Sequence, residues 1–260
     1  RRFSGRILPL TADGNAEIRT AAFGALSGVA RVDDLPALFV LLDGAESGVV
    51  ALVQKAIVAA ANQLIPATTR AEPLVQAIKT SSRPERIVEL LPQIGGPQAL
   101  AATIEQFESP ATEPKAAAFR ALVRWPGSDA ADRLFAIFAS GNETYRNQAY
   151  SGFVRQISTS SQPDDQKLLQ LRKTLAKIST IGDRRILIRA LERIKTFQSF
   201  LLAASFLDVA ENASEAAGAV MRLALPTPGK RDGMSGALVR NALTKAQQVL
   251  KGPQSGDDKE

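Results

Sequence analysis

One short helical pattern recurs along almost the whole chain, and it restricts the possible folds more than any other feature of the sequence. Each copy is a run of mainly small or aliphatic residues, and successive copies start 34, 30, 32, 31, 38 and 31 positions apart. The copies start at Ala22, Ala56, Arg86, Ala118, Ala149, Leu187 and Gly218. Further amphipathic stretches lie between them, at 35–42, 71–80, 98–108, 129–139, 163–178 and 198–207. The sequence therefore predicts repeated pairs of helices.

A single pair of this kind cannot bury its apolar stripe, so neighbouring pairs have to stack on one another. We predict an all-α fold, a right-handed α-α superhelix (solenoid) of about seven helix–turn–helix repeats, over residues 1–251. The longest interval contains the polar segment 158–165, which is either a hinge between two sub-arrays or an ordinary long loop. Residues 252–260 are polar and turn-rich, which predicts a linker or a disordered tail.

Composition excludes several classes of enzyme. The chain contains no histidine and no cysteine, so it cannot form a Ser-His-Asp triad, a thiol nucleophile or a zinc site of the usual type. We expect no catalytic residue, no metal and no cofactor in this segment. The 32 basic and 26 acidic residues give a mild excess of positive charge, and we expect neither nucleic acid as the partner nor a membrane span.

Residues 16–29 resemble the consensus of the HEAT repeat, with an acidic turn, an aliphatic residue, Arg19, small residues, an Ala-Leu pair and a glycine. The match recurs with decay along the chain. The resemblance implies an armadillo-like helical solenoid and is almost silent on activity; a protein-binding or scaffold role is our own expectation.

Residues 167–173, 184–191, 196–199 and 249–253 resemble the HEAT region of multidomain bacterial envelope proteins. In those proteins the HEAT region precedes a concanavalin-like jelly-roll domain associated with 3-keto-disaccharide or keto-glucoside hydrolysis. The resemblance implies a soluble periplasmic or extracellular setting, with any carbohydrate chemistry in a neighbouring domain outside this segment.

Basic residues occupy one equivalent position, three residues before the start of the pattern, in five of the copies. They are Arg19, Arg83, Lys115, Arg146 and Arg184. A row of cations suggests anion binding, but HEAT-like repeats use this position structurally, towards an inter-helix turn. Asp13, Asn142 and Asp183 are placed to accept, so we favour a structural role.

A second basic set is the candidate binding surface. Positions two and six after each start are four residues apart and therefore share one helix face. They hold Arg120 and Arg124, then Ser151 and Arg155, then Arg189 and Arg193, and Arg185 would extend the stripe. We predict a shallow basic groove that binds an acidic surface of a partner or neighbouring domain. The alternative is a solvated surface whose charges are balanced by Glu113, Glu192 and water.

Trp125, the single tryptophan, is a further candidate binding residue. It is either part of the core or an exposed platform on which a sugar stacks, and only the second role makes it a binding residue. The favoured function is thus a non-catalytic interaction module. One alternative is a HEAT-like DNA glycosylase, which needs an aromatic pocket with a catalytic carboxylate, whereas the chain has only three Trp and Tyr residues. The others are a nucleic-acid scaffold and a lyase- or chaperone-like protein for a tetrapyrrole carrier, for which no dedicated residues are evident.

Overall fold

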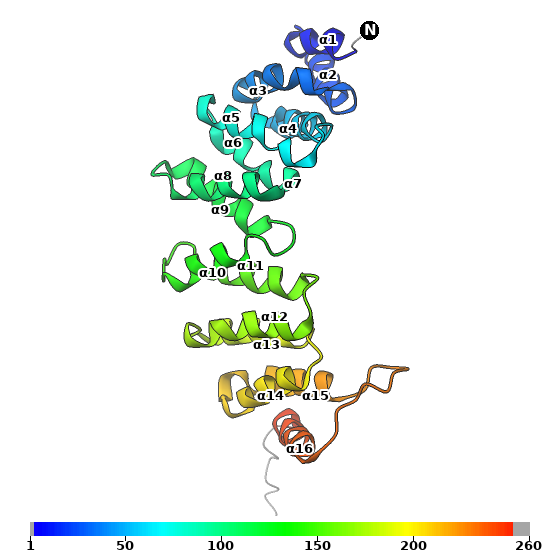
Figure 1. The fold of residues 1–260 in the computed structure, drawn as a ribbon, viewed down its shortest axis with the longest axis vertical. Helices are drawn as coiled ribbons and strands as arrows, with labels where there is room; N and C mark the ends of the chain where they lie inside the picture. Colours follow the sequence, from blue (N-terminus) through cyan, green and yellow to red (C-terminus); the bar gives the residue numbers. More distant parts are fainter. Residues whose placement is uncertain (1–2, 252–260) are drawn as a thin grey trace, which may run out of the picture. The chain divides into compact units, whose positions relative to one another are not determined.

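The computed structural model describes residues 3–251, and every regular element in that part of the chain is helical (Figure 1). This confirms the all-α prediction. The chain divides into two compact units, unit 1 (Arg1–Arg133) and unit 2 (Leu134–Glu260), and helix α10 (Ala131–Ala139) contains the division. Within residues 3–251, no helix is both long and apolar enough to cross a membrane.

In unit 1, the amphipathic stretches predicted at 35–42, 71–80 and 98–108 are helices α3, α5 and α8. Helix α2 packs on α4, α4 on α7, and α6 on α9, so the helices that carry the recurring pattern contact one another in succession. The helices are α1 (Ser4–Ile7), α2 (Ala16–Val29), α3 (Leu35–Gly44), α4 (Ser47–Ala61), α5 (Glu72–Thr80), α6 (Pro84–Val88), α7 (Leu91–Ile94), α8 (Gly96–Glu108) and α9 (Thr112–Arg124). Short 3-10 turns are η1 (Leu8–Ala12), η2 (Val32–Asp34) and η3 (Ala67–Thr69).

Unit 2 repeats this order of contacts, because α11 packs on α13, α13 on α15, and α15 on α16. Its further elements are α11 (Arg146–Thr159), α12 (Asp164–Arg172), η4 (Lys173–Ala176), α13 (Ile181–Leu191), α14 (Phe197–Ser205), η5 (Phe206–Asp208), η6 (Ala210–Asn212), α15 (Ala213–Ala224) and α16 (Ala237–Lys251). The segment 158–165 includes the end of α11, the short connection 160–163 and the start of α12, and its role as a hinge stays a prediction. The predicted tail at 252–260 lies outside the described residues.

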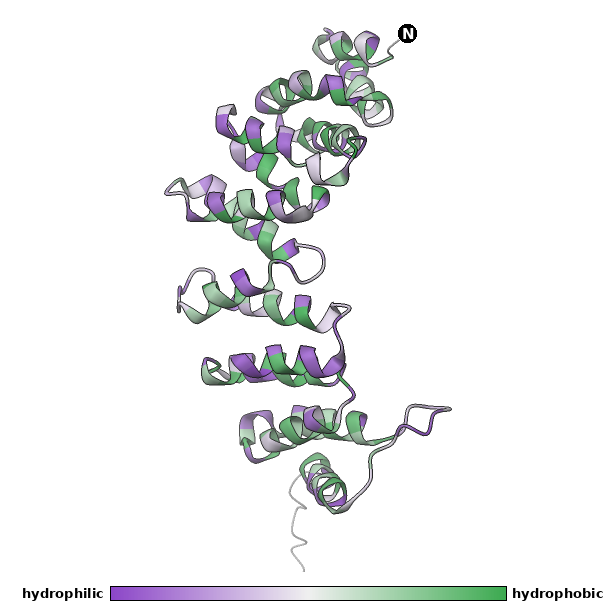
Figure 2. Ribbon diagram, in the orientation of Figure 1, coloured by the Kyte–Doolittle hydropathy of each residue, from purple (hydrophilic) through white to green (hydrophobic). Residues whose placement is uncertain are grey.

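Small residues at the repeated positions let these helices approach closely. Ala56, Ala118, Ala149 and Leu187 are fully buried, and most helices carry both hydrophobic and hydrophilic residues (Figure 2). The third copy is irregular, because Pro92 near the start of α7 cannot continue the helix that α6 begins. The helix that holds the third copy is therefore split into two short helices, α6 and α7.

Side-chain hydrogen bonds between helices join residues about one repeat apart. Gln54 Nε2 donates to the carbonyl of Arg86 at 2.8 Å, 32 residues away, and Gln63 Nε2 donates to that of Ala30 at 2.9 Å, 33 residues away. In unit 2, Asn212 Nδ2 donates to the carbonyl of Ile181 at 3.2 Å, 31 residues away. These helix pairs therefore make polar as well as apolar contacts with their neighbours.

Helix α16 was not predicted as a separate element. It lies against α15, with Val239 and Ala246 buried in the contact. The connection that leads to it is held near α13, because Lys195 Nζ donates to the carbonyl of Leu225 at 3.0 Å and pairs with Asp232 at 3.0 Å. Hydrogen bonds from the Thr227 side chain and backbone, together with that from Lys195, hold the pKa of Asp232 well below its usual range.

Candidate functional site

A basic groove of about 250 Å³ lies between α11 and α13 in unit 2. Residues from α11 form one wall, and residues from α13 and the turn after it form the other. The lining residues are Ser151, Val154, Arg155, Ser158, Ile186, Arg189, Ala190 and Arg193. We call this the α11/α13 groove. It contains two of the predicted pairs at positions two and six after a start, which we call column pairs: Ser151 with Arg155, and Arg189 with Arg193.

The groove forms because two helix faces with the same spacing are packed side by side. Residues four apart lie on one face of a helix, so each column pair projects in one direction. The neighbouring faces of α11 and α13 are apolar: Phe153 and Leu187, for example, are almost fully buried. Packing of these buried faces brings the flanking polar faces together at the groove.

The walls carry three guanidinium groups and no carboxylate. Arg155, Arg189 and Arg193 are all exposed, and among the described residues no acidic side chain forms an ion pair with Arg189 or Arg193. Ser158 Oγ donates to the carbonyl of Val154 at 2.6 Å. The C-terminal turns of these helices carry partial negative charge from the backbone, so the positive charge of the groove comes from the side chains.

The other predicted arginines are not part of this groove. Arg120 of unit 1 donates through Nη2 to Glu89 Oε1 at 2.6 Å, and Arg124 is exposed at the end of α9. The Nε atom of Arg185 lies 2.5 Å from Glu215 Oε1. Arg120 and Arg185 are thus ion-paired between neighbouring helices, and neither lines the groove. The sequence alignment of the copies shows where an arginine stands, but not which acidic residue of another helix pairs with it.

Trp125 is not an exposed platform. Only 1% of the residue is exposed, so its ring packs inside unit 1 and cannot stack on a sugar. Of the two predicted roles, the structure supports a place in the core. Trp125 is the C-cap residue of α9, and its backbone N–H donates to the carbonyl of Leu122.

We call the five basic residues three positions before the start of a copy the structural ladder. Three of them reach an inter-helix partner or turn, in three different ways. Arg19 Nη1 donates to the carbonyls of Asp13 and Gly14 at 2.7 and 3.0 Å, using the backbone of its turn and not the predicted carboxylate. Lys115 lies over the ring of Phe107, with 5.5 Å between Nζ and the ring centroid. Arg146 pairs with Asp183, which belongs to the next repeat.

The remaining ladder positions differ from the prediction. Among the described residues, the side chains of Arg83 and Arg184 form no hydrogen bond to a turn, and Arg86 takes over the role of Arg83. Its Nη1 donates to the carbonyls of Leu42 and Ala45 at 2.5 and 2.9 Å. The Asn142 side chain also differs from the prediction: among the described residues it accepts from no arginine side chain, and its Oδ1 accepts from the backbone N–H groups of Thr144 and Tyr145.

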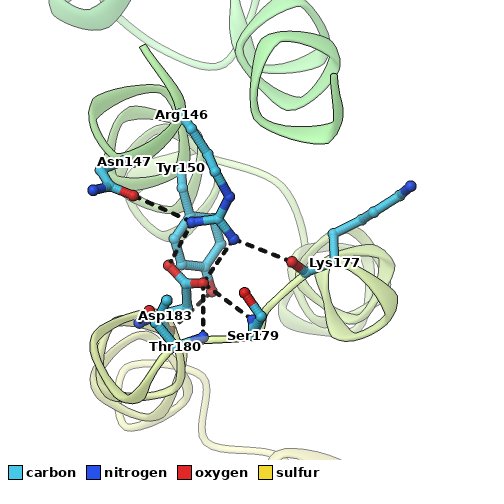
Figure 3. A network of polar contacts seen from close by, with 7 residues as sticks. All are labelled: Arg146, Asn147, Tyr150, Lys177, Ser179, Thr180 and Asp183. Atoms are coloured by element: carbon cyan, nitrogen blue, oxygen red, sulfur yellow. Dashed lines mark hydrogen bonds and ion pairs between the residues drawn. The ribbon is translucent and has the colours of Figure 1, made fainter. Parts of the chain in front are cut away.

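Figure 3 shows the polar network that the ladder forms at the start of α11 and α13. Arg146 Nη2 donates to Asp183 Oδ2 at 2.8 Å and to the carbonyl of Lys177 at 3.2 Å. Asp183 Oδ2 also accepts from the backbone N–H groups of Ser179 and Thr180, and the Thr180 hydroxyl accepts from the N–H of Asp183 in a capping box. The Asp183 carboxylate therefore caps the start of α13 and also links it to Arg146 at the start of α11.

Burial and hydrogen bonding shift the pKa values in this network. Burial works to raise the pKa of Asp183, but the hydrogen bonds from Arg146, Ser179 and Thr180 outweigh it and the pKa is lowered. The hydrogen bond to Asp183 raises the pKa of Arg146, and burial raises the pKa of Tyr150. The network is thus built around an ionised aspartate and a neutral tyrosine, whose hydroxyl donates to the carbonyl of Asp183 at 3.2 Å.

A larger groove in unit 1 was not predicted. It measures about 640 Å³ and lies between α3 and α5, with mainly apolar walls that include Leu35, Phe39 and Val40. The signal was present in the sequence, because all residues of 35–42 are apolar, so that this stretch, grouped above with the amphipathic ones, has no polar face. Such a run leaves apolar residues on the solvent side, and Val40 is 74% exposed.

A search against models of known protein families gives no match for the chain, and neither does a search of curated proteins.

Proposed function

We propose that this chain is a non-catalytic interaction module of HEAT type, and that the α11/α13 groove binds an acidic segment of a protein partner or neighbouring domain. One observation carries the proposal: three arginines line one small groove whose walls contain no carboxylate. Guanidinium groups bind carboxylates through charge-assisted hydrogen bonds, which are stronger than neutral ones. An acidic side chain is therefore the ligand that these walls suit best.

The size of the groove also favours a macromolecular partner. Pockets for small molecules usually measure roughly 300–1,000 Å³, whereas this groove has about 250 Å³. It accommodates one or two side chains of a larger partner more readily than a complete small substrate. This supports docking in preference to catalysis.

The stacked-repeat architecture is part of the proposal. The inter-helix hydrogen bonds at spacings of one repeat, and the successive contacts of α2 with α4 and of α11 with α13 and α15, support HEAT-type pairing inside each unit. A right-handed superhelix is the arrangement we propose for these pairs. In such an array the second helix of each pair lines the ligand-facing side, which agrees with a site on α11 and α13.

Two alternatives are weakened by the burial of aromatic residues. A glycosylase pocket and a sugar platform both use accessible Trp or Tyr rings, but of the three Trp and Tyr residues Trp125 and Tyr150 are 1% and 0% exposed and Tyr145 is half-buried. The bacterial envelope setting and the hydrolase-like neighbouring domain rest on the sequence resemblance. The reading frame around this segment tests both, since a signal peptide upstream and a jelly-roll domain downstream would support them.

The test of the groove is a triple substitution, Arg155→Gln/Arg189→Gln/Arg193→Gln. Its matched control, Arg172→Gln/Lys173→Gln/Arg240→Gln, removes the same charge from exposed positions of unit 2 outside the groove. Binding of a fluorescein-labelled Glu- and Asp-rich peptide to the full chain is measured by anisotropy. Loss of three exposed charge pairs should weaken binding by roughly tenfold or more, and the control should weaken it far less.

Equal weakening by the groove variant and the control would show a diffuse charge effect and overturn the proposal. A single-stranded DNA of matched charge serves as competitor. Displacement of the peptide by this DNA at far lower concentrations than an acidic peptide requires, with a steep dependence on salt, would favour the nucleic-acid alternative.

A further inference from the structure

The acidic residue closest to the groove arginines in sequence is Glu192. It follows α13 directly, three residues after Arg189 and one before Arg193. Side chains three or four positions apart on a helix are neighbours, and opposite charges at this spacing attract. An unrestrained Glu192 would therefore be placed to pair with Arg189 and to reduce the positive charge of the groove.

In the structure Glu192 has a different partner. Its Oε1 lies 2.5 Å from Nη2 of Arg222, which comes from α15 and not from either wall of the groove. The Glu192 side chain is 20% exposed, whereas that of Arg222 is 61% exposed. The carboxylate is thus held against α15, where it takes part in the contact between α13 and α15.

A second ion pair joins the same two helices with the charges exchanged. Arg185 of α13 pairs with Glu215 of α15, while Glu192, which follows α13, pairs with Arg222 of α15. Both pairs link residues 30 positions apart. Together the two ion pairs hold Glu192 and Glu215 at the contact between α13 and α15. Neither Arg189 nor Arg193 takes part in them.

On the basis of the groove function proposed above, we propose that the α11/α13 groove binds one oxyanion-bearing side chain of an acidic peptide, and that Arg222 keeps the groove cationic by holding Glu192 away from it. Arg222 is a positioning residue, since it acts through Glu192 and does not touch the ligand. The ligand is a carboxylate or a phosphomonoester, because both present oxygens to guanidinium groups.

The experiment uses the full chain and three fluorescein-labelled acidic peptides that differ only at a central position, which is phosphoserine, Glu or Gln. The protein variants are Arg222→Ala, Arg222→Lys and the double variant Arg222→Ala/Glu192→Gln. We expect Arg222→Ala to weaken binding of the phosphoserine and Glu peptides about fivefold, the size of one exposed ion pair. The double variant should regain the original affinity, and Arg222→Lys should retain it.

The double variant separates this role from a structural one. Arg222→Ala and the double variant both lack the ion pair to α15, so a purely structural defect would lower binding equally in both. Restored binding in the double variant supports the proposal. Unchanged binding in Arg222→Ala, or no recovery in the double variant, overturns it.

The same measurements distinguish its failure from failure of the groove function. If the triple groove variant loses binding but Arg222→Ala does not, only the role of Arg222 is overturned. If the Gln peptide binds as tightly as the other two, an oxyanion site is overturned as well. Tighter binding of the phosphoserine peptide than of the Glu peptide, or the reverse, identifies which oxyanion the groove prefers.

Discussion

The two ends of the α11–α13 pair use arginine in opposite ways. At the start of the helices, Arg146 is 18% exposed and pairs with Asp183, whose side chain is 4% exposed. At the other end, Arg155, Arg189 and Arg193 are exposed and line a groove without a carboxylate. Comparison of Arg146 with Arg189 and Arg193, for which the described residues supply no ion pair, teaches that the role of an arginine depends on whether the next helix supplies an acid to it.

The largest effect is expected for Asp183→Ala. The substitution leaves the Arg146 charge without its partner in a partly buried site and removes the acceptor for two backbone N–H groups. The free energy of unfolding should fall by about 3 kcal/mol, measured by urea denaturation. The double variant Asp183→Ala/Arg146→Met should lose less than the sum of the two single changes, and simple additivity would argue against a coupled pair.

Stability should also depend on pH through Asp183. Its pKa is lowered in the folded state, so its contribution is present above the unfolded value of about 4 and is lost as the pH falls through the folded pKa. Denaturation of the wild type between pH 6 and pH 2 should therefore show a decline that Asp183→Asn reduces. Parallel curves for the two proteins would contradict the assignment.

At alkaline pH, stability should depend on the ionisation of Tyr150. Burial raises the pKa of Tyr150, so its contribution to stability is complete below the unfolded value of about 10 and is lost as the pH rises towards the folded pKa. Tyr150→Phe removes one hydrogen bond and should cost about 1 kcal/mol at pH 7. It should also flatten the decline above pH 10, which thermal unfolding monitored by circular dichroism would measure.

The smallest effects are expected for arginines at the surface. Arg120→Gln removes the pair with Glu89, in which the arginine side chain is 46% exposed, and should cost less than about 1 kcal/mol. Arg189→Gln should change the unfolding free energy by no more than about 0.5 kcal/mol, because no acidic partner is lost. A cost for Arg189→Gln as large as that for Asp183→Ala would break the comparison between the two ends.

Part of the groove could be predicted from the sequence. The spacing of Arg189 and Arg193 places both on one helix face, and the repeat aligns them with Arg155 on the preceding second helix. The same reasoning could not separate these residues from Arg120 and Arg185. Their partners, Glu89 and Glu215, lie about 30 residues away on neighbouring helices, and the helix rotation that brings them together is set by packing.

The sequence by itself determined that the chain is all helical and where most helices lie, because helix formation follows from apolar spacing and small residues within one segment. Only the tertiary structure decided the partner of each charge, the burial of Trp125, the division at residue 133 and the place of α16. These features depend on contacts between segments that are distant in sequence. The pattern of one segment specifies its own apolar face, but not what the neighbouring helix presents to its polar face.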